Sequence, residues 1–179
     1  MKTNRIRLAV CTISHLEEFY KFRNDEKYLN FVNANPNAVD YNQFKEEYNL
    51  SLVNRPYQYM VYCNENIIGY TYLHTISKYH GYCYLNIFIK KEFETKGFGL
   101  EILYLMHLHV FNELKMHKMY LEIFDSNNLS LKSAQSAGFV QEGFFKEHLV
   151  RNGRRISVYR FACYKELPKR VTEIMKRFL

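Results

Sequence analysis

Glycine and proline are scarce in this chain of 179 residues, which holds 7 glycines and 3 prolines and no tryptophan. It also has no internal repeat, no low-complexity segment and no linker-like stretch. No apolar run approaches the roughly 18 residues that a membrane-spanning helix needs. The basic residues at the start are not followed by the apolar segment of a secretory signal. We therefore expect one globular domain over residues 1–179, located in the cytoplasm.

Metal-binding patterns are missing as well. The four cysteines lie far apart in the sequence and form no C-x-x-C pair. They are Cys11, Cys63, Cys83 and Cys163. His107 and His109 are two positions apart, so on a helix their side chains would diverge rather than share a metal. We expect buried, reduced thiols and no metal site.

Positive charge and aromatic side chains are what the chain has in excess. It contains 25 Lys and Arg against 18 Asp and Glu, a formal net charge of +7, and 16 Tyr with 14 Phe. Such a charge favours anionic partners, for example a phosphorylated cofactor, a nucleotide-linked substrate or a ribosomal surface. There is no Arg-Gly repeat, no aromatic RNA-binding signature and no zinc-finger spacing, so we expect no direct recognition of nucleic acid.

The pattern of apolar residues and turns predicts both strands and helices. Strands are predicted at 5–10, 57–63, 66–76, 81–90, 118–124, 140–150 and 155–165. Helices are predicted at 14–24, 40–52, 98–114 and 127–137, with a short amphipathic helix in the tail at 168–179. The order β-α-α-β-β-β-α-β-α-β-β is typical of a mixed α/β domain.

Local signals refine several boundaries. Ser14 and Glu17 have the spacing of a capping box at the start of the first helix, and Asp40 is expected to cap the second. The Asn and Pro content of residues 33–39 predicts a loop. The Asn-Gly pair within 151–153 predicts a tight turn between the last two strands.

The segment KEFETKGFGLEIL, residues 91–103, places two of the scarce glycines at the entrance of a predicted helix. Glycine costs stability in a helix, so Gly97 and Gly99 indicate that something approaches the backbone closely. A helix N-terminus offers unpaired N–H groups and a favourable dipole to a phosphate, and Lys96 adds a positive charge. The alternative is that the glycines only shape a turn between strand and helix.

With ETKGFG between the fourth strand and a long helix, the sequence resembles the GNAT superfamily of acyl-CoA N-acetyltransferases. The phosphate-binding signature of that family is Arg/Gln-x-x-Gly-x-Gly/Ala. Gly97 and Gly99 match it. Glu94 stands at the Arg/Gln position, and Thr95 stands where glycine is frequent.

A second motif, about 30 residues further on, supports the resemblance. NNLSLKSAQSAGFVQEG is similar to the Asn-x-x-Ser…Gly-Phe-x-x-Glu-Gly pattern of the RimJ/RimL-like branch, which acetylates protein N-termini, amino sugars and antibiotics. The matching residues are Asn127, Ser130, Gly138, Phe139, Glu142 and Gly143. The segment 151–165 resembles the closing hairpin of that branch, with Ser157 where an Asp is common.

The resemblance implies an α/β (α+β) fold: a mixed, mostly antiparallel central sheet, flanked by helices and splayed between the fourth and fifth strands. It also implies that acetyl-CoA is the acetyl donor, with its pantetheine arm along the strand at 84–90 and its pyrophosphate at the glycine loop. An N–H from the Ile87–Ile89 region would polarise the thioester carbonyl. The cofactor-binding residues implied are Ile87, Phe88, Ile89, Glu94, Thr95, Lys96, Gly97, Phe98, Gly99, Asn127 and Ser130.

Acetyl transfer to an amine requires that the ammonium lose a proton and that the departing thiolate be stabilised or protonated. Many relatives use a Tyr four residues before the Gly-Phe pair as the acid, but that position is Ala134 here. Ser130 is our candidate donor to the thiolate, with a role near the helix cap as the alternative. Candidates for the base are Glu122 and His74, and a water chain without a side-chain base is a further option.

We therefore expect an acetyl-CoA-dependent N-acetyltransferase that acts on a primary amine by direct attack on the thioester. An amino sugar or nucleotide-linked amino sugar, an antibiotic and a protein N-terminus all remain open as acceptors, as do monomer and homodimer. Residues 24–56 would shape the acceptor side. An alternative, suggested by Glu94, Ala134 and Ser157, is a non-catalytic acyl-CoA-binding module that acts through a protein partner. A basic RNA-binding protein, with retention lost steeply in salt, is a third. We expect no membrane partner.

Overall fold

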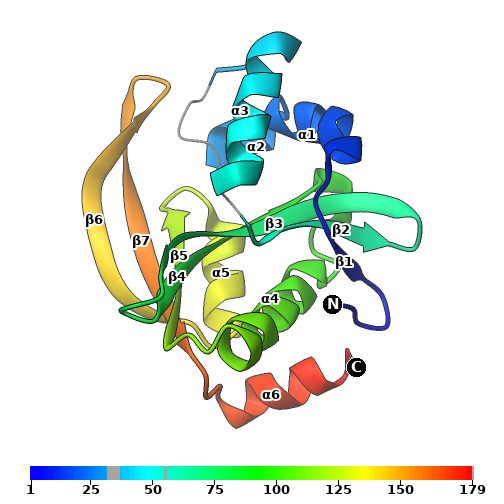
Figure 1. The fold of residues 1–179 in the computed structure, drawn as a ribbon. Helices are drawn as coiled ribbons and strands as arrows, with labels where there is room; N and C mark the ends of the chain where they lie inside the picture. The colour runs from blue at the N-terminus through cyan, green and yellow to red at the C-terminus, as the bar shows by residue number, and fades with distance from the viewer. Residues whose placement is uncertain (32–36, 55, 179) are drawn as a thin grey trace.

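The computed structural model describes residues 1–31, 37–54 and 56–178. One seven-stranded sheet, in the order β1-β2-β3-β4-β5-β7-β6, runs through the molecule (Figure 1). Its strands are β1 (Arg7–Val10), β2 (Gln58–Cys63), β3 (Asn66–Ser77), β4 (Tyr82–Ile89), β5 (Lys118–Phe124), β6 (Val140–Arg151) and β7 (Arg154–Tyr164). Neighbouring strands pair antiparallel except β4 and β5, which are parallel. The predicted mixed, mostly antiparallel α/β fold is confirmed.

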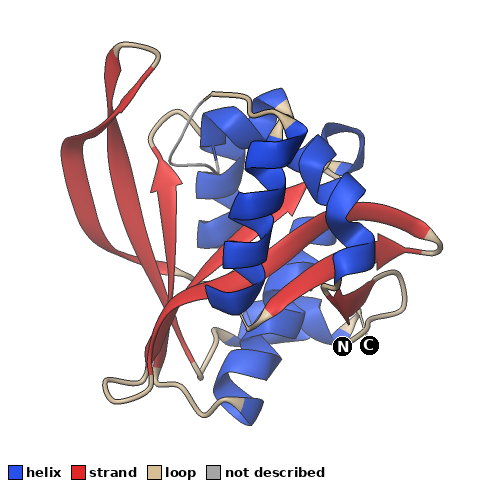
Figure 2. Ribbon diagram, turned by 45° about the horizontal axis from the view of Figure 1, so that its top comes forward, coloured by secondary structure: helices blue, strands red, loops and turns tan. Residues whose placement is uncertain are grey.

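Helices cover both faces of the sheet (Figures 1 and 2). They are α1 (Leu16–Arg23), α2 (Glu26–Phe31), α3 (Tyr41–Asn54), α4 (Phe98–Leu108), α5 (Asn128–Ser136) and α6 (Lys169–Lys176). The first three lie on one face and α4 and α5 on the other, with α6 beyond α4. Each candidate site residue therefore lies on the α1–α3 face of the sheet, on the α4–α5 face, or at the edge of a strand.

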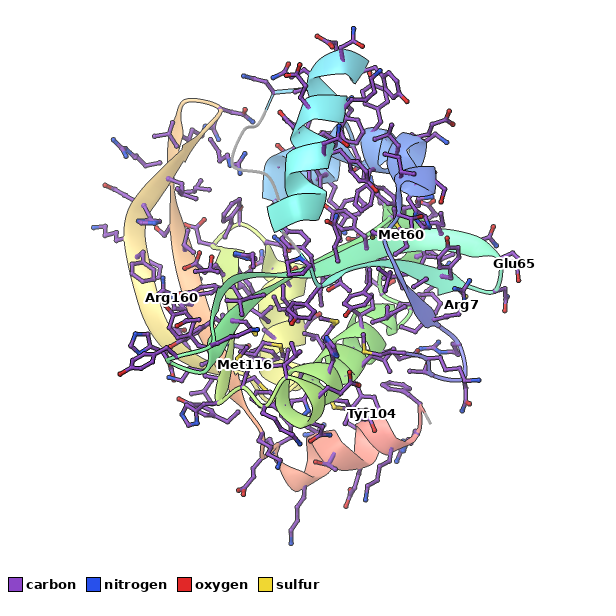
Figure 3. The ribbon with its side chains drawn as sticks, in the orientation of Figure 1. Arg7, Met60, Glu65, Tyr104, Met116 and Arg160 are labelled. Carbon is purple, nitrogen blue, oxygen red and sulfur yellow. The ribbon has the colours of Figure 1, made fainter. Side chains whose placement is uncertain are left out.

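Strand side chains alternate between two hydrophobic clusters because successive residues of a strand point to opposite faces. Tyr72 and Phe88 pack in the cluster under α1–α3. Leu73 and Leu85 pack in the cluster with residues of α4, α5 and α6. Met60 belongs to the α1–α3 side and is fully buried on β2 (Figure 3). Both faces of the central strands are thus covered.

Strands β4 and β5 separate after a short paired stretch. They pair only at Tyr82–Lys118, Cys83–Met119 and Tyr84–Tyr120. Beyond this point β4 continues to Ile89 along β3, and β5 continues to Phe124 along β7. The predicted splay is confirmed, and we call the opening between the two strands the fork. The irregularity beside it lies in β3, between His74 and Ser77, whereas β4 keeps a regular register.

Two local predictions are confirmed by hydrogen bonds and dihedral angles. Asp40 Oδ1 accepts from the backbone N–H groups of Asn42 at 2.8 Å and Gln43 at 3.0 Å, so it caps α3. Asn152 and Gly153 both have positive φ, 48° and 73°, as the tight hairpin turn between β6 and β7 requires.

Other boundaries differ from the prediction. The capping box at Ser14 is wrong, because the chain first makes a 3₁₀ turn at Ile13–His15 in which His15 Nδ1 accepts from the Thr12 N–H at 3.0 Å. The long helix predicted to residue 114 ends at Leu108 and continues as a wider π turn, His109–Glu113. Helix α2 was not predicted at all. The predicted loop at 33–39 lies largely outside the described residues.

Candidate active site

The loop between β4 and α4 leaves backbone donors without acceptors. After a 3₁₀ turn at Lys91–Phe93 the chain reaches Gly97, whose φ of 85° and ψ of −3° place it in the left-handed region. Gly97 O accepts from the N–H groups of Leu100 and Glu101 at 3.1 and 3.3 Å. Across the described parts of the chain, nothing accepts from the N–H groups of Phe98 and Gly99. Two free donors at a helix N-terminus favour an anion.

Gly99 is a glycine that the fold does not require. Among the described residues, a Cβ built there would meet only Ile89 Cδ1, at 3.6 Å, an ordinary van der Waals contact. Glycine at a helical position costs up to about 1 kcal/mol relative to alanine. The missing side chain therefore leaves room beside the free N–H groups for a group outside the chain. This is the fit that a cofactor phosphate needs.

Arg5 adds a positive charge to the same loop. Its Nη1 donates to Lys96 O at 3.2 Å, and its guanidinium lies 4.8 Å from the centre of the Phe98 ring. The guanidinium also pairs with Glu101, which is fully buried in the first turns of α4. Sequence reasoning missed Arg5 because 91 positions separate it from Lys96 and nothing local marks the contact.

Glu94 and Thr95, at the start of the loop, point to different partners. Glu94 forms an ion pair with Lys27 of α2, and Lys27 Nζ also donates to Ile89 O at 2.8 Å. Thr95 Oγ1 donates to the Glu94 carbonyl at 2.7 Å. The acidic residue at the family's Arg/Gln position is therefore paired with a cation. Lys27 is a second residue that sequence reasoning missed.

The open edge of β4 consists of alternate backbone groups. Lys90 N–H donates to Ile68 O at 2.8 Å, and Phe88 lies opposite Tyr70. Because hydrogen bonds alternate along an antiparallel pair, Phe88 bonds to β3 while the N–H and C=O groups of Ile87 and Ile89 point toward the fork. Phe88 is 1% exposed, with its ring among buried aromatic side chains. Of the three predicted residues, Ile87 and Ile89 face the opening with their backbone.

Helix α5 begins beside the other arm of the fork. Asn127 is its cap, and its Oδ1 accepts from the Ser130 N–H at 3.2 Å. Ser130 is half-buried, and its hydroxyl has no partner among the residues that the structure describes. Ala134, where many relatives carry Tyr, is buried in the core. Since β4 and β5 are parallel, the N-termini of α4 and α5 follow the same edge of the sheet.

The opposite face of the fork carries aromatic rings. Ring centres are 5.5 Å apart between His74 and Tyr84, and 5.0 Å apart between Tyr84 and Tyr120. Glu122, two residues beyond Tyr120, accepts from Arg160 Nε at 3.1 Å and Nη2 at 2.7 Å. The strand registers thus put Glu122 and His74 on one face of the sheet, and Arg160, labelled in Figure 3, lies opposite Glu122 on β7. Ser130 belongs to α5, and α5 lies on the other face of the sheet (Figure 1).

Among the rings around the fork, Tyr84 has a shifted pKa. Burial raises the pKa of Tyr84, and the nearby Arg160 guanidinium opposes this only in part. Tyr84 therefore stays a neutral phenol near pH 7 and can donate a proton or hydrogen bond but cannot act as a base. Arg160 itself was not anticipated, because only the register of β5 with β7 sets it opposite Glu122.

Glu142, from the second motif, forms hydrogen bonds between strands. Its carboxylate accepts from Lys118 Nζ at 3.1 Å and from the Tyr164 hydroxyl. The bond from Tyr164 and the contact with Lys118 hold the pKa of Glu142 below its ordinary value. The group ties the starts of β5 and β6 to the end of β7.

Cysteines and metal-ligand types form no further centre in the described ranges. Burial raises the pKa of the Cys11, Cys83 and Cys163 thiols to about 12, and Cys63 is half-buried. Within residues 1–31, 37–54 and 56–178, no three His, Cys, Asp or Glu gather as metal ligands would. Over the same ranges, no helix has both the length and the apolar content to span a bilayer.

Comparison with known proteins adds a family. The model of the acetyltransferase (GNAT) domain matches residues 5–140. Spermidine N(1)-acetyltransferase of Vibrio cholerae serotype O1 is 27% identical over 149 residues, which cover 77% of this chain and 86% of that protein.

Solved structures agree with this fold. The spermidine N-acetyltransferase of Vibrio cholerae, crystallised with CoA and spermine, superposes with a TM-score of 0.82 at 23% identity, over 90% of this chain and 96% of that one. A putative acetyltransferase from T. thermophilus superposes with a TM-score of 0.83 at 19% identity, over 100% and 96%. The family match agrees with the fork and with the N–H groups of Phe98 and Gly99 that lack acceptors in the described chain. This chain therefore belongs to the GNAT acetyltransferase family and is an N-acetyltransferase whose acetyl donor is acetyl-CoA.

Proposed function

We propose that the acetyl group passes directly from acetyl-CoA to the primary amine of a small molecule at the fork between β4 and β5. The observation that carries this proposal is the open edge of β4 leading to the free donors of the loop. Lys96, Phe98 and the two glycines would hold the phosphates, with Thr95 and Glu94 shaping the loop. The backbone of Ile87 and the N–H of Ile89 would pair with the amide-bearing arm, since the Ile89 carbonyl already accepts from Lys27.

The reactive end of the donor would lie near Tyr84, where β4 and β5 part. There the Ile87 N–H is our candidate to polarise the thioester carbonyl. Phe88, buried behind this edge, would support the strand. Ser130 would stabilise the departing thiolate, since its hydroxyl has no partner among the described residues and it lies in the first turn of α5, with Asn127 holding that turn.

Glu122 and His74 are the candidate bases. Both lie on the face from which an amine would approach if the donor occupied the side of α4 and α5. Glu122 forms an ion pair with Arg160, which offsets its negative charge. An arriving ammonium would therefore contact a carboxylate that is also bound to a guanidinium. The His74 ring lies tilted against the Tyr84 ring at the base of the fork. Either side chain could take a proton from the ammonium directly or through water.

A polyamine is the first acceptor to test. This choice is supported by two relatives. One, similar in sequence, is a spermidine N(1)-acetyltransferase, and the other, similar in structure, is a spermidine N-acetyltransferase crystallised with CoA and spermine. In this chain the rings of Tyr84 and Tyr120 could contact an ammonium through cation–π interactions. Glu122 would accept a hydrogen bond from the ammonium while it stays paired with Arg160.

A nucleotide-linked amino sugar is the second candidate, and a specific observation favours it. Arg160 lies 5.5 Å from the Tyr84 ring and 5.8 Å from the Tyr120 ring, so the acceptor face offers a cation beside flat rings. Stacking on a sugar or base and pairing with a phosphate would use both. The net charge of +7 also favours an anionic acceptor over a polycation. A protein N-terminus, as in the RimJ/RimL-like branch, remains a prediction from the second motif.

The test is acetyl transfer by purified protein, measured by CoA release and product mass. The acceptors are spermidine, a nucleotide-linked amino sugar, and a peptide with a free N-terminus. We expect turnover with one small amine, reduced about tenfold or more in Glu122→Gln or Ser130→Ala. Binding of acetyl-CoA without transfer to any amine would contradict the proposal and favour the non-catalytic module. We further propose one domain in the cytoplasm, with sedimentation deciding between monomer and homodimer.

A further inference from the structure

The loop that receives the phosphates carries a carboxylate of its own. Glu94 lies three residues before Gly97 and stands where the family signature has Arg or Gln. A carboxylate beside two phosphate charges opposes their binding, since like charges repel at short range. Any use of this loop for a phosphorylated cofactor therefore needs the charge of Glu94 to be offset or turned away.

Lys27 meets that need from another part of the chain. Its ammonium pairs with the Glu94 carboxylate, and the two side chains are only 25% and 23% exposed. The same ammonium donates to Ile89 O at 2.8 Å and lies 5.3 Å from the centre of the Phe88 ring. Lys27 thus joins the start of the loop to the carboxyl end of β4.

The position of Lys27 is fixed by the helix that carries it. Asp25 Oδ1 caps α2 by accepting from the N–H groups of Lys27 at 2.9 Å and Tyr28 at 3.2 Å. Tyr28 is 9% exposed and packs against Phe88, with ring centres 5.7 Å apart. Short as it is, α2 is anchored on β4 itself, so the ammonium is held rather than left on a free arm.

We propose that Lys27 is a positioning residue for acetyl-CoA: it neutralises Glu94 and keeps that carboxylate at the end of β4, so that the phosphates meet main-chain N–H groups and not a carboxylate. This rests on the proposed role of the loop. Lys27 itself does not touch the reacting atoms. Lys27 Nζ also donates to Ile89 O, the last carbonyl on the open edge of β4. The cofactor arm can therefore not donate to that carbonyl, and its pairing with β4 would end there.

The experiment is calorimetric titration of acetyl-CoA into the wild type, Lys27→Met, Glu94→Gln and the double variant. We expect Lys27→Met to weaken binding about tenfold, because it leaves Glu94 unpaired beside the phosphates. Glu94→Gln should bind within about twofold of the wild type, and the double variant should recover most of the loss. The melting temperature of each variant is measured alongside.

The affinities of the four proteins distinguish a role of Lys27 in neutralising charge from a purely structural role. If the pair were only structural, both single variants would lose affinity and stability together and the double variant would be no better; that result overturns the proposal. Lys90→Met is the matched control, since Lys90 pairs with Glu18 at 2.6 Å and follows β4 directly but is not paired with the loop. It should leave the affinity unchanged. Absence of wild-type binding would instead contradict the role of the loop itself.

Discussion

At the scale of the residue, the two loop glycines have different reasons to be glycine. Gly97 has a φ of 85°, which side chains rarely adopt, and a Cβ there would lie 3.2 Å from Arg5 Nη2. Gly99 has neither constraint, and its nearest neighbour would be a methyl group of Ile89 at 3.6 Å. Gly97 is therefore needed for the left-handed backbone conformation, whereas Gly99 leaves space beside the start of α4.

The two positions should respond oppositely to alanine. Gly97→Ala is expected to cost about 1–2 kcal/mol of unfolding free energy because of the left-handed backbone. Gly99→Ala should leave it unchanged or raise it by up to about 1 kcal/mol. Urea unfolding of both variants measures this. Equal losses would show that the fold needs both glycines.

Arg5 and Glu101 form the ion pair beside the loop. Glu101 is fully buried and also accepts from Thr3 Oγ1, so removal of the cation leaves a buried charge only partly compensated. Arg5→Met is expected to cost about 2 kcal/mol, less than a fully buried pair because Arg5 is half exposed. Arg5→Met combined with Glu101→Gln should regain part of it. A loss below 0.5 kcal/mol, roughly that of a surface pair, would contradict this account.

Glu142 gives the fold a dependence on acid. Its pKa is lowered from the ordinary 4.5 by the Tyr164 hydroxyl and by Lys118. A carboxyl whose folded pKa is depressed adds stability above its unfolded pKa, and this is lost as the pH falls through the lower folded value. The stability of the wild type should therefore fall more steeply below pH 4.5, the ordinary value, than that of Glu142→Gln. Parallel curves would exclude this contribution.

At the scale of the element, α2 connects the two arms of the fork. Lys27 bonds to the end of β4, and the Leu29 carbonyl accepts from Arg151 Nη1 at 3.0 Å at the end of β6. Arg151 is buried, with its guanidinium 5.2 Å from the centre of the Phe124 ring at the end of β5. The helix therefore spans the opening on the face where we place the acceptor.

Removal of the second contact should affect the acceptor more than the donor. In Arg151→Met, α2 stays attached to β4 but loses its tie to β6, so the width of the acceptor side is no longer fixed. We expect KM for the amine to rise about fivefold or more while the Kd of acetyl-CoA changes less than twofold. Steady-state kinetics and calorimetry check the two halves. A parallel loss of cofactor affinity would assign Arg151 to the whole fold instead.

How far the elements follow from sequence depends on whether their signals are local. Asp40 and the Asn-Gly turn act within three residues of their effect, so α3 and the last hairpin were predicted correctly. Helix α2 is only six residues long and has no apolar stripe to detect. Besides its cap at Asp25, it is held by the packing of Tyr28 on Phe88, a contact that only the fold creates.

At the scale of the whole molecule, the family motifs predicted the fork and the glycine loop with its own charges, Glu94 and Lys96, but not the charges that reach them from elsewhere. Arg5, Lys27 and Arg160 reach the site from segments distant in sequence, and each is placed by register or by packing. The candidate acid, Ser130, was predicted from a motif position, and the candidate bases, Glu122 and His74, were predicted as the nearest titratable residues on neighbouring strands. The structure assigns them to opposite sides of the sheet, which no one-dimensional pattern expresses.

The net charge of +7 allows the acceptors to be separated by salt. A basic protein attracts an anionic acceptor at long range and repels a polycation, and both effects are screened as the ionic strength rises. For a nucleotide-linked amino sugar, KM should rise between 50 and 300 mM salt, about twofold or more. For spermidine it should fall or stay constant. A rise for spermidine would mean that a local acidic surface outweighs the net charge.

The central claim is that the N-terminus of α4 holds the phosphates of acetyl-CoA, with Gly99 leaving the space. The most direct test is calorimetric titration of acetyl-CoA into the wild type and Gly99→Ala, with unfolding measured on both. We predict that the wild type binds and that the variant loses about tenfold or more in affinity without loss of stability. Equal affinities in the two proteins would contradict the claim, because a group in contact with that backbone could not ignore a Cβ placed against it.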